Sequence, residues 1–310
     1  MVKKIVLYLV IASFAVTLTA CSDFNLFSWA HKKGSSADKD VLISDGEVAL
    51  NKKDYNDAKT YFEKVLEGDP NNSVALYGYT QAVMGASGLG LADIISAVIQ
   101  QSVTGSAPSL GDYNYVFYPS PKFGAVSDLL PATLDLKKLY DTSVALIPKL
   151  KKIADGQGDG VIPADDVDVN VNLGVYLALR AVCELLDTNG DGTPGGTGDL
   201  VQVYSNYNVT LPTQAQLDAL TKAQITAFRN KVQNAVWGIV GGGTESYDKG
   251  ALDYFLVAIN KIGAKSGSAL SDLKGNIDEF KADQTNGINA LKKQINDQIT
   301  ANYPDIPLIQ

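Results

Sequence analysis

Apolar residues recur at three- and four-residue intervals along most of this chain, which is the spacing of amphipathic α-helices. The segments with this pattern cover residues 89–101, 127–153, 173–186, 213–238, 251–262 and 268–299. The segment 173–186 is apolar on nearly every side, which predicts a helix buried in the core. Alternation of apolar and polar positions, the mark of a strand, is limited to residues 200–204. We therefore expect an all-α fold.

Local signals predict where some helices begin or bend. Thr213 and Thr221 are each followed three residues later by a glutamine, Gln216 and Gln224, which is the spacing of a capping box at a helix start. Pro148 lies inside a helical segment. Because proline has no backbone N–H to donate, a kink or a helix end is expected there.

The first twenty residues have the features of a secretory signal peptide. Two lysines near the start are followed by an apolar run at residues 5–16 and by small residues before Cys21. The run is too short to cross a bilayer as a helix, which takes about 20 apolar residues. We expect residues 1–20 to be removed. Cys21 is then either the lipid-bearing first residue of a lipoprotein or an incidental cysteine in an ordinary secreted protein.

The ending Leu18-Thr19-Ala20-Cys21 resembles the lipobox of bacterial lipoproteins. The resemblance implies cleavage before Cys21 and attachment of lipid to this cysteine. Ser22 then favours the outer membrane, by analogy with lipoprotein sorting in two-membrane bacteria. Residues 21–40 are polar and unpatterned, which is typical of a flexible tether. We expect a protein of the cell envelope, anchored by lipid and facing the periplasm.

Residues 41–85 resemble the tetratricopeptide repeat (TPR), a helix-turn-helix unit of about 34 residues. The residues that match are Gly46, the turn Lys53-Asp54-Tyr55, Ala58, Phe62 and Asp69-Pro70, followed by Ala75, Leu76 and Tyr79 of a second unit. The match stops after Gly85. The resemblance implies a helical hairpin used for protein recognition. A stable stack takes about three units, so helices within residues 86–302 are expected to complete it.

The first of two acidic, glycine-bearing loops spans residues 155–166. Its oxygen donors occupy alternate positions, and Gly160 stands where a tight turn requires it. Such a loop directs several oxygens at one centre, which suits a hard cation. The spacing resembles an EF-hand loop of the dockerin type, which implies calcium ligands at Asp155, Gln157, Asp159, Val161 (through its carbonyl) and Asp166.

The second loop, residues 187–199, opens with the same spacing but departs from the pattern in its closing half. The implied ligands are Asp187, Asn189, Asp191 and, one residue late, Asp199. For both loops the alternative is an acidic turn at a helix end. Calcium in these loops would be structural, with a weak Kd on the order of 10⁻⁴ M.

A cluster of aromatic residues lies in a long connecting segment at about residues 104–124, and it comprises Tyr113, Tyr115, Phe117 and Tyr118. Loops of this length are uncommon without a purpose. The aromatic side chains either bind a ligand or partner, or fix the loop to the helical core.

Charge and histidine content limit the classes of function. Without residues 1–20 the chain has 24 basic and 34 acidic residues, a net charge of −10 from 24 − 34. Such an acidic chain is a poor candidate for binding nucleic acid. The single histidine, His31, lies in the tether, so histidine-based triads, Cys-His pairs and zinc sites are not expected in the folded part.

Cysteine content limits the chemistry further. Once Cys21 carries lipid, Cys183 is the remaining cysteine and has no disulfide partner within the chain. Its apolar surroundings in sequence predict a buried, unreactive side chain. We expect no enzyme, but a TPR-type scaffold for another envelope protein or peptide. The alternative is an accessory lipoprotein of an envelope transporter that binds a hydrophobic small molecule.

Overall fold

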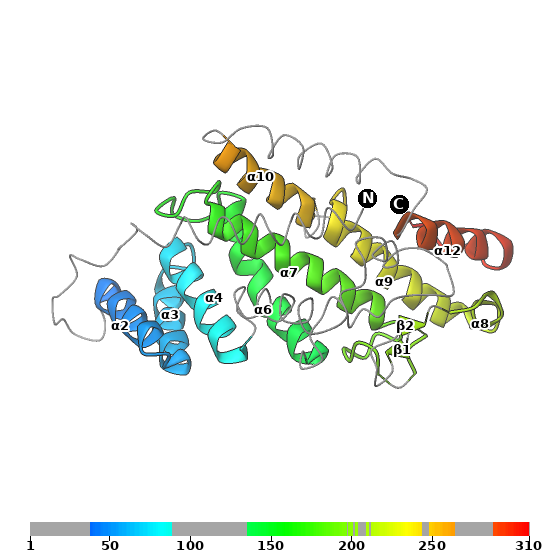
Figure 1. The fold of residues 1–310 in the computed structure, drawn as a ribbon, viewed down its shortest axis with the longest axis horizontal. Coiled ribbons are helices and arrows are strands. Elements are labelled where there is room, and N and C mark those ends of the chain that lie inside the picture. Colours follow the sequence, from blue (N-terminus) through cyan, green and yellow to red (C-terminus); the bar gives the residue numbers. More distant parts are fainter. Residues whose placement is uncertain are drawn as a thin grey trace, which may run out of the picture.

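The computed structural model describes residues 38–88, 135–196, 198–200, 202–203, 209–210, 212–243, 248–263 and 288–309. The helices are α2 (Lys39–Asn51), α3 (Tyr55–Gly68), α4 (Ser73–Ser87), α6 (Leu136–Ala154), α7 (Val167–Leu186), α8 (Gln214–Asp218), α9 (Lys222–Val240), α10 (Ala251–Gly263) and α12 (Ile288–Asn302). The strands β1 (Gln202–Val203) and β2 (Val209–Thr210) form one short antiparallel pair. The fold is all-α, as the apolar spacing predicts (Figure 1).

The starts of α8 and α9 are fixed by the two predicted capping boxes. The hydroxyls of Thr213 and Thr221 accept hydrogen bonds from the backbone amides of Gln216 and Gln224, and the glutamine side chains accept from the threonine amides. The segment 213–238 is therefore two helices. In contrast, α6 continues through Pro148 and does not end there.

The central helix α7 begins at Val167, six residues before the predicted apolar segment. Asp166 caps its start by accepting a hydrogen bond from the amide of Val169 at 3.0 Å. The first turns contain the buried side chains of Asn170 and Asn172, whose amide groups donate to backbone carbonyls one turn earlier. The first turns of α7 therefore lie in the core although they contain polar residues, and the spacing of apolar residues does not predict them.

Helices α2, α3 and α4 pack side by side around the fully buried ring of Phe62. A Cβ atom at Gly46 would lie 2.8 Å from Phe62 Cζ, and one at Gly78 would lie 2.3 Å from it. These two glycines therefore let α2 and α4 approach the ring. The three helices, called the hairpin layer below, have a small core of their own, which contains Leu42, Ala49, Ala58, Phe62, Val65, Ala75, Tyr79 and Ala82.

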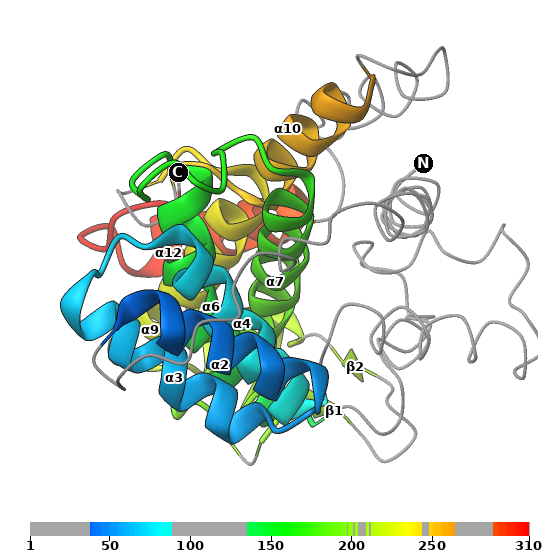
Figure 2. The ribbon, with the colours of Figure 1, turned by 90° about the vertical axis from the view of Figure 1, so that its left-hand side faces the viewer.

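The remaining helices form a larger body around α7. Helices α6, α9 and α10 pack against α7, and α12 packs against α9. In Figure 1 the hairpin layer lies at one end of the molecule and α12 at the other. Figure 2 shows α2 and α3 in front of the body when the molecule is viewed from the hairpin end. The two parts meet where α4 packs against α6.

The prediction that residues 173–186 form a buried helix is confirmed. Leu173 and Tyr176 are fully buried, and Leu177 is nearly so. Among the described helices, α7 alone has the length and apolar composition of a membrane span, and 67 % of its most apolar window is buried within the fold. Burial of this kind is typical of the core helix of a folded domain.

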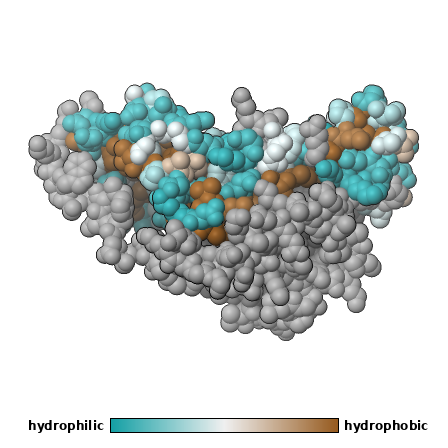
Figure 3. All heavy atoms as spheres, turned by 90° about the horizontal axis from the view of Figure 1, so that it is seen from above, coloured by the Kyte–Doolittle hydropathy of each residue, from teal (hydrophilic) through white to brown (hydrophobic). Residues whose placement is uncertain are grey.

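Apolar side chains on the described surface are scattered. The large apolar residues that are exposed are Val48, Val144, Val161 and Leu308. On the coloured part of the face in Figure 3, apolar residues form small patches between polar ones. Isolated exposed apolar residues are ordinary on protein surfaces, so these residues do not by themselves mark a binding site.

Candidate functional site

The two acidic loops lie at opposite ends of α7, and the first of them begins where α6 ends. Asp155 is only 12 % exposed, and both of its carboxylate oxygens have partners. Lys151 Nζ lies 2.6 Å from Oδ2, while Lys249 Nζ and the Tyr254 hydroxyl donate to Oδ1 at 2.9 and 3.0 Å. Burial acts to raise the pKa of Asp155, but the lysine hydrogen bonds outweigh it and hold the pKa below its usual range. Asp155 thus ties α6 to the start of α10.

Asp159 faces the hairpin layer instead. Its Oδ1 accepts hydrogen bonds from both the amide and the hydroxyl of Ser73, the first residue of α4, and from the amide of Val161. The Asp159 amide donates to the carbonyl of Asn71 at 2.8 Å, and Lys152 Nζ donates to the carbonyl of Pro70 at 2.6 Å. This set of contacts, called the joint below, fastens the α3–α4 turn to the first acidic loop.

The other predicted ligands of the first loop are placed separately. Asp166 caps α7, the Gln157 side chain is exposed, and Val161 is 63 % exposed. Asp155, Asp159 and Asp166 thus have partners on different elements. In the described part of the chain, no three His, Cys, Asp or Glu side chains are grouped so that they could hold a metal ion.

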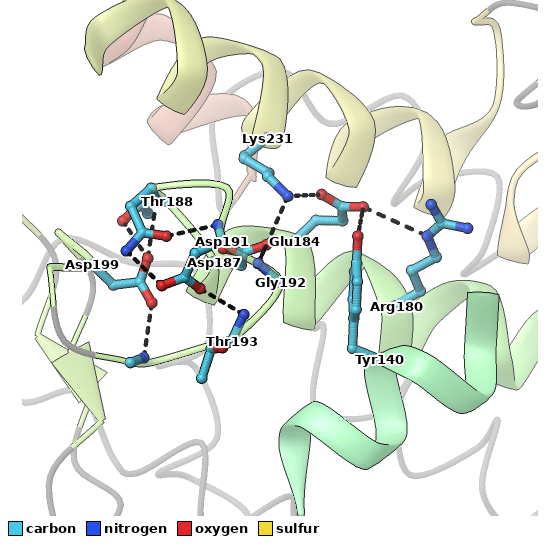
Figure 4. A network of polar contacts seen from close by, with 12 residues as sticks. Tyr140, Arg180, Glu184, Asp187, Thr188, Asp191, Gly192, Thr193, Asp199 and Lys231 are labelled. Atoms are coloured by element: carbon cyan, nitrogen blue, oxygen red, sulfur yellow. Dashed lines mark hydrogen bonds and ion pairs between the residues drawn. The ribbon is translucent and has the colours of Figure 1, made fainter.

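In the second loop, Asp187 follows α7 directly and its side chain is fully buried. Its Oδ2 accepts hydrogen bonds from the amide of Gly192 at 3.2 Å and from Lys231 Nζ at 2.8 Å (Figure 4). Its Oδ1 is buried and has no hydrogen-bond partner. A buried carboxylate oxygen without a donor is unusual, because most buried polar atoms have a partner.

Asn189 and Asp191 form the exposed edge of the same loop. The Asp191 amide donates to Asn189 Oδ1 at 2.9 Å, and the Thr193 amide donates to Asp191 Oδ1 at 2.7 Å. Gly190 and Gly192 both have a φ of 77°, in the left-handed region that favours glycine. The residues at the alternating donor positions predicted from the sequence therefore form a tight turn.

Asp199 closes the second loop from inside. It is buried and accepts hydrogen bonds from the Thr188 hydroxyl at 3.1 Å, the Asn189 amide at 3.0 Å and the Gly196 amide at 2.8 Å. Burial raises the pKa of Asp199 although these hydrogen bonds oppose the shift. Both of its oxygens are thus used to hold the loop backbone.

A buried ionic network that was not among the predicted sites adjoins the second loop. Lys231 of α9 bridges Asp187 and Glu184, with 3.0 Å from its Nζ to Glu184 Oε2 (Figure 4). Arg180 and the Tyr140 hydroxyl each lie 3.5 Å from Glu184 Oε1. A signal was present, because positions 180, 184 and 187 are spaced to share one face of the mostly apolar segment that begins at residue 173.

Cys183 is buried, as predicted, and burial raises the pKa of its thiol to about 12. The other predicted site residues lie outside the described residues. They are the lipidation site Cys21 and the aromatic residues Tyr113, Tyr115, Phe117 and Tyr118.

Comparison with known protein families, with curated proteins and with solved structures finds no match to this chain. The resemblances to the lipobox, the TPR and the EF-hand therefore stay predictions.

Proposed function

We propose that this chain is a lipid-anchored scaffold of the cell envelope that binds another envelope protein or a peptide through its hairpin layer. Lipid on Cys21 would hold it at the membrane, and the tether would separate the folded part from the bilayer. The single histidine and its place in the tether support a non-enzymatic role.

The observation that carries this proposal is the attachment of the hairpin layer to the body. The layer has its own core around Phe62, and the joint fastens its α3–α4 turn to the body through Ser73 and Asp159. A rigid surface loses little conformational freedom when a partner binds, so less binding energy is spent on ordering it. A fixed layer of helices at one end of the molecule is suited to this use.

Structural calcium is part of the same proposal. The spacing of oxygen donors in both acidic loops supports it. Both loops adjoin the central helix, so an ion in either loop would stiffen the body that carries the hairpin layer.

The test uses photo-crosslinking in native membranes. A photoreactive residue is placed either at Val48 on α2 or at Val144 on α6, two valines that are both 42 % exposed. We expect the same protein or peptide to be captured reproducibly from Val48 and not from Val144. Equal capture from both positions, or from neither, would contradict recognition by the hairpin layer.

A further inference from the structure

Among the predicted carboxylate ligands, Asp187 differs from the others in one respect. Both oxygens of Asp155 and both of Asp199 accept hydrogen bonds, whereas Asp187 Oδ1 is buried and has no donor. An acceptor left without a partner in a buried position is costly, and ordered water or a cation can remove that cost.

The surroundings of Asp187 favour a cation. Gly192 and Lys231 hold Oδ2, and the hydrogen bond from Gly192 places the carboxylate within the turn of the loop. The side-chain oxygens of Asn189 and Asp191 follow at alternate positions on the exposed edge, where an ion from solution can reach the loop. Oxygen donors of this kind are the ligands of hard divalent cations.

The first loop lacks this combination. Asp155 is neutralised by Lys151 and Lys249, and Asp159 holds Ser73 in the joint. A cation in the first loop would have to displace these contacts. A cation that binds Asp187 Oδ1 would displace no hydrogen bond, because this oxygen accepts none.

We propose that the second acidic loop binds one calcium ion through Asp187 Oδ1 and the side-chain oxygens of Asn189 and Asp191, and that Lys231 competes with the ion for Asp187. This inference rests on the structural-calcium part of the proposed function and assigns it to one loop. The proposed ligands are the buried carboxylate of Asp187, the exposed carboxylate of Asp191 and the amide oxygen of Asn189. A site of this composition does not need a group of three acidic side chains, and no such group is found among the described residues.

The position of Lys231 leads to an effect that distinguishes this proposal from a purely structural role of the loop. The Lys231 ammonium group neutralises Asp187 without metal, and the same positive charge repels an incoming cation. Removing this charge should therefore weaken the metal-free fold but tighten calcium binding, by about tenfold from a Kd on the order of 10⁻⁴–10⁻³ M. A purely structural lysine would have the first effect and not the second.

The experiment is a calorimetric titration of the full-length protein in detergent with calcium chloride. We expect Asp187→Asn to abolish binding, Asn189→Ala to weaken it, and Lys231→Gln to tighten it. The matched controls are Asp155→Asn and Lys249→Gln, which alter the equivalent ion pair of the first loop and should leave the affinity unchanged. Magnesium should bind less tightly, because its small octahedral shell suits a flexible loop poorly.

Several outcomes would overturn the proposal: no binding at millimolar calcium, loss of binding in Asp155→Asn but not in Asp187→Asn, or weaker binding in Lys231→Gln. Circular dichroism of each metal-free variant checks that it is folded. If a buried variant does not fold, Asn189→Ala decides the question, because this exposed side chain can be removed without opening the core. Crosslinking from Val48 is independent of these titrations, so failure of calcium binding and failure of the scaffold proposal can be told apart.

Discussion

Ser73 and Asp159 are 86 residues apart in the chain, and the amide and hydroxyl of Ser73 both donate hydrogen bonds to Asp159 Oδ1. Ser73 is fully buried, and Asp159 accepts the proton of its hydroxyl, while the hydroxyl oxygen accepts from the amide of Ile162. The contact joins the first residue of α4 to a loop that begins at the end of α6, and thereby joins the hairpin layer to the body.

Replacing Asp159 with alanine should loosen the hairpin layer selectively. The change leaves the buried Ser73 hydroxyl without its acceptor, which costs about 1–3 kcal/mol. Hydrogen–deuterium exchange should therefore speed up in α2, α3 and α4 more than in α9. Asp165→Ala is the control in the same loop, because its pair with Lys261 is about half exposed and contributes at most about 1 kcal/mol. Uniform acceleration throughout the fold would argue against a local joint.

Gly78→Ala should destabilise the protein, whereas Gly68→Ala should not. A Cβ at position 78 would lie 2.3 Å from Cζ of the buried Phe62 ring, and overpacking of this kind costs about 1–3 kcal/mol. Nothing lies within 4 Å of a Cβ at position 68, so alanine there should add up to about 1 kcal/mol through lower unfolded-state entropy. Thermal unfolding should give shifts of opposite sign, and shifts of the same sign would contradict the packing around Phe62.

Glu47 makes the stability of the hairpin layer depend on pH. Burial raises the pKa of this carboxyl from 4.5 to about 7. Between these values the folded state retains a proton that the unfolded state has released, so the free energy of unfolding falls as pH rises through this window. Glu47→Gln should therefore stabilise the protein near pH 8 by about 1 kcal/mol, after allowance for solvent screening, and have little effect near pH 4.

Denaturant unfolding of Glu47→Gln at both pH values measures this difference. Glu67→Gln is the control, since Glu67 is an exposed glutamate of the same layer. An equal effect of Glu47→Gln near pH 4 and pH 8 would exclude titration of Glu47 as the cause.

Cys21→Ala should abolish attachment to the membrane. Without the thiol no lipid can be added, so labelled palmitate should enter the wild-type protein and not the variant. The variant should also remain unprocessed or appear in the soluble fraction. Labelling of both proteins to the same extent would favour the ordinary signal peptide over the lipobox.

Helix starts could be predicted from the sequence where the residues that fix them are close together in the chain. Capping boxes at Thr213 and Thr221 mark two helix starts, because the interacting groups are three residues apart. The early start of α7 could not be predicted from apolar spacing, since Asn170 and Asn172 are polar yet buried through hydrogen bonds to the helix backbone.

The partners of the acidic loops could not be predicted, because they come from distant parts of the chain. Lys249 lies 94 residues from Asp155, and Ser73 lies 86 residues from Asp159. The spacing of carboxylates in the first loop is the same whether its oxygens face an ion or protein donors. A sequence pattern alone cannot distinguish the two uses, and the difference depends on which residues the fold brings near.

The central position of α7 has a consequence for synthesis of the chain. Helices α9 and α10, which cover much of α7, lie within the 77 residues that follow it, from 187 to 263 (263 − 186). At a translation rate of about 5–20 residues per second, these residues take roughly 4–15 s to make. For that time α7, whose segment 173–186 is mostly apolar, has α6 but neither α9 nor α10 packed against it. We expect the growing chain to be prone to aggregation at this stage, and a holdase chaperone that binds the nascent segment 167–186 to protect it.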